Sequence, residues 1–218
     1  MIVLALDAAT YSGSVALIRE GKVSAEAVVA MRGEREERLM PAIANLLSGN
    51  GVTVDDLEAV ACGAGPGSFT SLRIAAAIAK GICAAKEIPL LVAPSPLLVV
   101  SGAIPVLQPG EYIVALDAMR GDYFCQEVSV FHDQRLLPGE SWRTSRDDLV
   151  ARASDAGRTI VGPKEANAMT PHARGFSLLI EQGTAFRIDM TSWEPDYGRK
   201  AEAQVRWEAS HGRPLGEG

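Results

Sequence analysis

The sequence predicts an α/β protein made of two lobes, each with a mixed sheet and flanking helices, and three observations predict it. The first 30 residues alternate short apolar runs with turn residues, which is typical of strands. Apolar residues then recur at helical spacing in two segments that are separated by further strand-like runs. Finally, the pattern of residues 2–18, a strand ending at an aspartate followed by a turn and a second strand, returns at residues 112–131.

The composition is that of a folded protein of one elaborated domain or two small ones. The chain has 218 residues, of which 47% are apolar and 22% charged, with 21 glycines and 12 prolines. A net charge of −6 argues against a large phosphate-binding surface for nucleic acid. The three cysteines fit neither a disulfide framework nor a CxxC metal pair, which favours a reducing compartment.

The first half of the chain reads as an antiparallel start followed by a βαβ unit. Gly21 marks the turn between the second and third strands, and Gly49-Asn50-Gly51 ends the first helix. The elements expected in order are strands 2–6, 14–18 and 22–29, a helix over 34–47, a helical turn at 53–56, strand 57–62, a helix over 71–86 and strand 90–93.

A proline-rich segment separates the two predicted lobes. Five prolines between residues 88 and 110 favour extended connections and exclude a membrane helix there. We place the boundary at 104–110, giving an N-terminal lobe of residues 1–108 and a smaller C-terminal lobe of residues 109–218. The second lobe is expected to contain strands 112–116 and 123–131, a helix over 146–156, strand 159–161 and a charged helix over 199–210.

The segment Gly63-Ala64-Gly65-Pro66-Gly67-Ser68 lies between a predicted strand and a predicted helix. Glycines at such a junction let backbone N–H groups converge on an anion at the helix N-terminus. The segment matches neither a P-loop nor a dinucleotide fingerprint, because no Gly-Lys-Ser/Thr follows and the GxGxxG spacing is absent. Two interpretations remain open here, a phosphate cradle and a tight strand-to-helix turn.

Two aspartates occupy matching positions in the two lobes. Asp7 and Asp117 each follow a first strand and precede a turn, where actin-like and sugar-kinase-like proteins keep a carboxylate near a nucleotide-bound metal. Together with Gly65, Gly67 and Ser68 they could form a vestigial nucleotide or phosphate site. Aspartates that only shape the two turns are the alternative.

The sequence lacks the motifs that a metallopeptidase site or a serine-nucleophile site would require. The three histidines, His132, His172 and His211, form no HxxxH or HExxH pair, so a helical metallopeptidase site cannot be built. No GxSxG elbow supports a serine nucleophile, and Cys62 at a strand end is expected to be a core thiol. We therefore predict no catalytic residue and no metal ligand in this chain.

The second long helix is rich in alanine, at positions 75, 76, 77, 79, 84 and 85. Such a smooth surface lets a neighbouring helix approach closely. It serves either core packing or, if exposed, assembly with another chain.

Several segments resemble the TsaB family, also called YeaZ, over nearly the whole chain. The most specific is GAGPGSFTSLRIAAAIAKGI, and the others, in order, are LALDAATYSGSVAL, ERLMPAIANLL, LDAMRGDYF and PDYGRKAEA. The family usually has Gly where this chain has Ser71 and His-Ser-Glu where it has Arg35-Glu36-Glu37. Both departures lie on helices expected to pair with a partner.

The resemblance implies an actin/sugar-kinase-like (ASKHA) fold and a scaffold role in the synthesis of tRNA N6-threonylcarbamoyladenosine at position 37. Family members pair with a catalytic TsaD-type paralogue, which holds its metal with an HxxxH pair, and recruit a small TsaE-type ATPase. No intrinsic cofactor is implied, since ATP and metal belong to the partners; alone, the chain would form a homodimer, and it would contact tRNA indirectly. The pairing residues that the resemblance implies are Arg35, Glu37, Leu39, Met40, Ile43, Phe69, Leu72, Arg73, Ala76 and Lys80.

The N-terminus has no positively charged region before its apolar run, so we expect no signal peptide and a cytoplasmic protein without a membrane contact. The alternative function is a small ASKHA-type ATPase or phosphotransferase that uses Asp7, Asp117 and the Gly63–Gly67 loop. On the last predicted helix, Arg199, Lys200 and Arg206 form either a small basic stripe or part of a solvated face that also carries Glu202 and Glu208.

Overall fold

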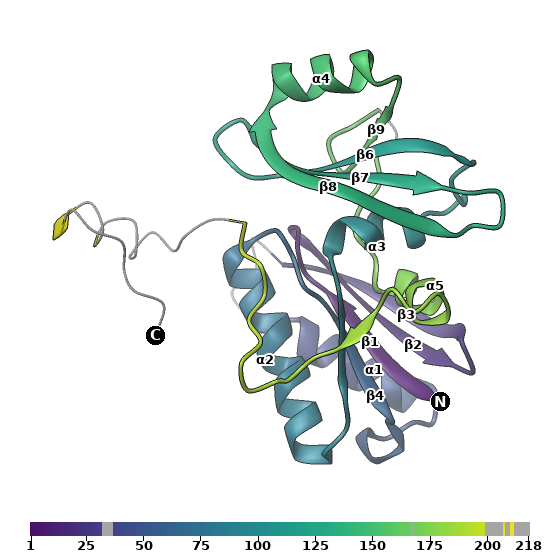
Figure 1. Ribbon diagram of the computed structural model, residues 1–218. Coiled ribbons are helices and arrows are strands. Elements are labelled where there is room, and N and C mark those ends of the chain that lie inside the picture. The colour runs from purple at the N-terminus through teal and green to yellow at the C-terminus, as the bar shows by residue number, and fades with distance from the viewer. Residues whose placement is uncertain (32–36, 167, 199–206, 208–209, 212–218) are drawn as a thin grey trace.

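The structure is a computed structural model that describes residues 1–31, 37–166, 168–198, 207 and 210–211. Its described elements form two sheets, one above the other in Figure 1. The expected α/β class, with two mixed sheets and flanking helices, is confirmed.

The first sheet has six described strands in the order β10-β5-β4-β1-β2-β3. The strands β1 (Ile2–Asp7), β2 (Ser12–Arg19) and β3 (Lys22–Ala30) form the expected antiparallel meander, and β4 (Ala59–Gly63) lies parallel to β1. The last two strands are β5 (Leu90–Ala93), parallel to β4, and β10 (Phe186–Arg187), antiparallel to β5.

The second sheet repeats the arrangement of the first. Its described strands are β6 (Gly110–Asp117), β7 (Asp122–Val130), β8 (Leu136–Ser145) and β9 (Thr159–Val161), in the order β8-β7-β6-β9. The first three are antiparallel and β9 is parallel to β6, as β4 is to β1. The repeated sequence pattern at residues 112–131 therefore reflects a repeated topology.

The core consists of three apolar clusters, which the two sheets separate from one another. Helices α1 (Leu39–Gly49) and α2 (Phe69–Lys86) cover one face of the first sheet with an apolar cluster that includes Ile43, Leu47 and Ala79. A second cluster fills the space between the two sheets, with α3 (Ser95–Ser101) and α5 (Phe176–Glu181). Helix α4 (Arg146–Asp155) covers the far face of the second sheet (Figure 1).

The structure corrects the prediction for the proline-rich segment. Residues 95–101, expected to be extended, form helix α3, because Pro94 precedes the helix and Pro96 lies in its first turn. A proline there breaks no helical hydrogen bond, since the first N–H groups of a helix have no partner within it. Strand β8, the one-turn helices η1 (Val54–Asp56) and η2 (Ala173–Gly175), and helix α5 complete the described elements, and of these only η1 was predicted.

The chain returns to the first sheet after it has formed the second. Strand β10 pairs with β5, so residues of the range 109–218 contribute to both sheets. The exact lobe boundary near residue 108 stays a prediction. The expected helix over 199–210, with Arg199, Lys200 and Arg206, falls mostly outside the described residues. Within the described part of the chain, no helix combines the length and apolar character of a membrane span.

Candidate functional site

Asp7 is fully buried at the end of β1 and does not line a pocket. Its carboxylate accepts a hydrogen bond of 2.6 Å from the Ser95 hydroxyl and one of 3.0 Å from the Ala9 N–H. Burial raises the pKa of the Asp7 carboxyl to about 6, although both hydrogen bonds act to lower it. The side chain therefore ties the end of β1 to the start of α3.

Three N–H groups of the glycine loop donate to acceptors within the fold. The N–H of Ala64 donates to the Ala93 carbonyl at 2.8 Å, that of Gly65 to the Ser95 hydroxyl at 3.1 Å, and that of Ser68 to the Ala9 carbonyl at 2.7 Å. These three donors are engaged within the fold, so they do not contribute to an anion site, and the vestigial phosphate site stays a prediction.

Gly65 and Gly67 are needed because other backbone segments pass directly against them. A Cβ at Gly65, whose φ is +84°, would lie 2.1 Å from the Asp196 carbonyl oxygen. A Cβ at Gly67 would lie 2.1 Å from the carbonyl oxygen of Ala9. Close packing between backbones, rather than anion binding, accounts for both glycines.

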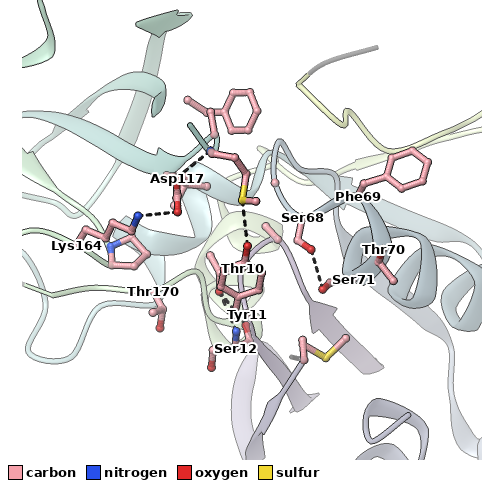
Figure 2. A pocket seen from close by; sticks show the side chains of 18 residues that line it. Thr10, Tyr11, Ser12, Ser68, Phe69, Thr70, Ser71, Asp117, Lys164 and Thr170 are labelled. Carbon is pink, nitrogen blue, oxygen red and sulfur yellow. Dashed lines mark hydrogen bonds and ion pairs between the residues drawn. The ribbon is translucent and has the colours of Figure 1, made fainter. Parts of the chain in front are cut away.

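A pocket of about 690 Å³ lies between the lobes (Figure 2). The turn after β1, the start of α2 and the turn after β6 supply most of its walls. The lining residues are Ala9, Thr10, Tyr11, Ser12, Met31, Gly67, Ser68, Phe69, Thr70, Ser71, Leu116, Asp117, Ala118, Met119, Phe124, Pro163, Lys164 and Thr170. Most of this surface is apolar, with hydroxyl groups at intervals.

Asp117 lines this pocket, but its charge is already compensated. Its carboxylate forms an ion pair of 2.7 Å with Lys164. Burial raises the pKa of Asp117, but the Lys164 ammonium and the Met119 N–H more than offset this and hold the pKa below its usual range. Of the two aspartates that the sequence places at matching positions, only Asp117 lines this pocket. Sequence reasoning missed Lys164, although the preceding Gly162-Pro163 turn was visible.

Reactive thiols and metal clusters are not found among the described residues. Cys62, Cys83 and Cys125 are buried, and burial raises the pKa of each thiol, to about 11 for Cys83 and about 12 for Cys125. In the described ranges, no three His, Cys, Asp or Glu side chains lie close enough together to hold a metal ion.

The expected pairing residues of the first helix divide between the core and the surface. Leu39 and Ile43 are buried against the sheet, whereas Met40 is 43% exposed. The Glu37 carboxylate accepts hydrogen bonds from the N–H groups of Leu39 and Met40 and so caps the start of α1. Arg35 lies outside the described residues.

Helix α2 shows the same division. Leu72 and Ala76 are buried, Arg73 is exposed, and Phe69 and Lys80 are half-buried. The alanines of α2 divide between the two uses that the sequence left open. Those at positions 75, 76 and 79 pack in the core, whereas those at positions 77, 84 and 85 are exposed and available for assembly. The exposed residues along the middle of the outer side are Thr70, Arg73, Ala77, Gly81 and Ala84, which we call the outer stripe.

The chain is similar to proteins of tRNA modification. Residues 30–155 match the family model of TsaD, described as tRNA N6-adenosine threonylcarbamoyltransferase. The tRNA threonylcarbamoyladenosine biosynthesis protein TsaB of Escherichia coli K12 is 34% identical over 127 residues, and that of Haemophilus influenzae is 32% identical over 129 residues. These matches cover 58% and 59% of this chain but 54% of each relative, so the chain spans about half the length of the curated relatives it matches.

Solved structures show the same fold. The structure of YeaZ from Pseudomonas aeruginosa superposes with a TM-score of 0.71 at 22% identity, covering 89% of this chain and all of that one. A second Pseudomonas aeruginosa structure, described as uncharacterized with similarity to peptidase YeaZ, gives a TM-score of 0.72 at 22% identity, over 91% of this chain and 99% of that one.

Proposed function

The chain belongs to the TsaB (YeaZ) family, and from this premise we propose that it is a non-catalytic subunit of the machinery that makes tRNA N6-threonylcarbamoyladenosine. Its role is to pair with the catalytic TsaD-type paralogue and to help recruit a small TsaE-type ATPase. ATP and metal are bound by those partners, and tRNA is contacted through them, as the net charge of −6 favours.

The outer stripe of α2 is the observation that carries this proposal. Ala77, Gly81 and Ala84 present little more than backbone to solvent, on a helix of 18 residues whose other side is fixed in the core. Small residues let a second helix approach until its own side chains fill the space. Met40 on α1 adds an exposed apolar side chain on the same helical layer. In isolation this face joins two copies of the chain.

The inter-lobe pocket supports a non-catalytic role. Its carboxylate Asp117 is paired with Lys164, and Asp7 is buried away from it. A phosphotransferase of this fold would need carboxylates that hold Mg²⁺ beside N–H donors for the phosphates. The loop donors of Ala64, Gly65 and Ser68 are already bonded to protein oxygens. The ATPase alternative therefore has a pocket, but only one of its two expected carboxylates lines it and these three loop donors are already engaged.

Mixing the chain with its TsaD-type paralogue from the same genome tests the proposal. Size-exclusion chromatography with light scattering is expected to give a one-to-one complex. Ala77→Glu should abolish this complex, because it places a charge in the centre of the outer stripe. Ala151→Glu is the matched control, since Ala151 is an exposed alanine on α4, on the far side of the second sheet. Separate elution of the two wild-type proteins would contradict the pairing, and an unaffected Ala77→Glu variant would contradict the assigned face.

A further inference from the structure

Helix α2 lies between α1 and a segment that follows β10. Helix α1 packs on β2 and β3, α2 packs mainly on β4, and β10 is at the opposite end of the sheet. After β10 the chain runs along α2 (Figure 1). We call residues 193–197, the part of this segment that contacts the side of α2, the strap.

One half of the strap contacts Lys80. The Glu194 carboxylate forms an ion pair with the Lys80 ammonium at 3.1 Å, and the Trp193 ring lies 5.6 Å from the same ammonium. The Tyr197 hydroxyl donates to Glu194 at 3.1 Å, which orients the carboxylate toward the helix.

The other half of the strap contacts Phe69 at the start of α2. The rings of Tyr197 and Phe69 are tilted, with their centroids 4.6 Å apart. The Arg73 guanidinium lies 5.2 Å from the Phe69 centroid. Tyr197, Phe69 and Arg73 thus form a continuous series of ring and cation contacts that leads from the strap to the outer stripe, to which Arg73 belongs.

Backbone contacts fix the strap in place. Pro195 is buried, and the Asp196 N–H donates to the Ala64 carbonyl at 2.8 Å. The Asp196 backbone fills the space that a side chain at Gly65 would need. The strap is therefore an ordered part of the surface of the first lobe, and it packs directly on the glycine loop.

We call the surface formed by α1 and the outer stripe of α2 the pairing face. We infer that the strap borders this face on the side away from α1, and that it holds Phe69, Arg73 and Lys80 for contact with the TsaD-type paralogue. The inference rests on the proposed function, which supplies the partner. Of these three residues, all predicted to contact a partner, Phe69 and Lys80 contact the strap directly and Arg73 contacts Phe69. Tyr197 and Glu194 act as positioning residues, and a face bounded on both sides restricts the angle at which a partner helix can cross it.

Affinity for the purified TsaD-type paralogue, measured by isothermal titration calorimetry, tests the inference. Tyr197→Ala is expected to raise the Kd about tenfold, because the ring that holds Phe69 is lost. Glu194→Gln should raise it about threefold through release of Lys80. Tyr197→Phe keeps the ring and should stay within about twofold of wild type, a rescue that unfolding of the strap would not give.

Matched controls lie on the second lobe. Phe131→Ala removes a ring that stacks with Arg135 at 4.5 Å, and Glu140→Gln breaks an exposed ion pair of 2.7 Å with Arg152. Both variants should bind the paralogue as the wild type does. Circular dichroism melts of every variant establish that the fold is intact.

Three results would overturn the inference. Tyr197→Ala with unchanged affinity, while Ala77→Glu abolishes binding, leaves the proposed function standing and removes the strap from the face. Tighter binding by Tyr197→Ala would mean that the strap covers the face instead of bordering it. If wild type fails to bind, the proposed pairing fails and the inference fails with it. If wild type and Ala77→Glu both bind normally, the pairing stands but does not use the outer stripe, and the inference fails alone.

Discussion

The protonation of one buried carboxyl, that of Asp7, makes the stability of the fold depend on pH. Its folded-state pKa of about 6 lies above the ordinary value of 3.8, so the folded protein holds the proton more tightly than the unfolded chain does. The resulting stabilisation is complete below pH 3.8 and is lost as the pH rises through 6. The carboxyl therefore stabilises the fold in acid, the reverse of a salt-bridged aspartate.

Urea unfolding at several pH values should detect this titration. The free energy of unfolding of wild type relative to Asp7→Asn is expected to fall by about 2 kcal/mol between pH 4 and pH 8. Ser95→Ala removes a hydrogen bond that favours the charged form, so it should move the midpoint of that fall to higher pH. A difference that does not change with pH would show that Asp7 titrates normally.

The comparison must be made against Asp7→Asn because His172 titrates in the opposite sense. Burial, followed by the nearby charge of Arg174, lowers the pKa of His172 to about 4. Its stabilising contribution is present above the ordinary value of 6.5 and is lost as the pH falls through 4. Both proteins carry this histidine, so its contribution cancels in the difference.

Two glycines should respond in opposite directions to the same substitution. Gly65→Ala forces a Cβ against the Asp196 carbonyl at a positive φ, so it should reduce the free energy of unfolding by about 3 kcal/mol. Gly81→Ala meets nothing within 4 Å in the middle of α2, so helix propensity should raise it by about 0.5–1 kcal/mol. Urea titration measures both changes, and equal effects would contradict the close contact between Gly65 and the Asp196 backbone.

At the scale of elements, local sequence signals predicted most of the first lobe. The strands of the β1–β3 meander, α1, α2, β4 and β5 each have a clear period, and all of them except β1 have a glycine or proline near one end. Helix α3 was missed because its prolines resemble breakers, and their harmless position in the first turn is visible only once the helix start is known. Strand β8 carries Pro138 and Gly139 and mixed polarity, which an edge strand tolerates but which obscures its period.

Helix α4 offers a test of the element boundaries. Ser145 is its N-cap, and the Ser145 hydroxyl accepts a hydrogen bond from the Asp148 N–H at 3.2 Å. Ser145→Ala should lower the free energy of unfolding by about 1 kcal/mol, whereas Ser145→Asp should retain most of the stability. Chemical denaturation of the two variants decides this, and equal losses would argue against a cap at this position.

At the scale of the whole molecule, a candidate site depends on which residues the two lobes bring together. Sequence reasoning correctly identified Asp7 and Asp117 as matching positions, and the repeated topology explains why they match. It could not tell that one lies under α3 and the other in the pocket, because this depends on how the lobes pack. Nor could it detect the strap, whose contacts join residues more than 100 positions apart in the sequence.

The arrangement of the lobes also predicts how the protein responds to nucleotide. Calorimetric titration with Mg-ATP should give no saturable heat at millimolar concentration. The Asp117–Lys164 ion pair offers no net charge to a phosphate or a metal, and the loop N–H donors of Gly65 and Ser68 are committed to the fold. Lys164→Ala frees the Asp117 carboxylate, so testing this variant in parallel shows whether the ion pair is what prevents metal binding. Saturable Mg-ATP binding by wild type that Asp117→Asn abolishes would instead favour the phosphotransferase alternative, and the pairing face would then be an addition to a working nucleotide site.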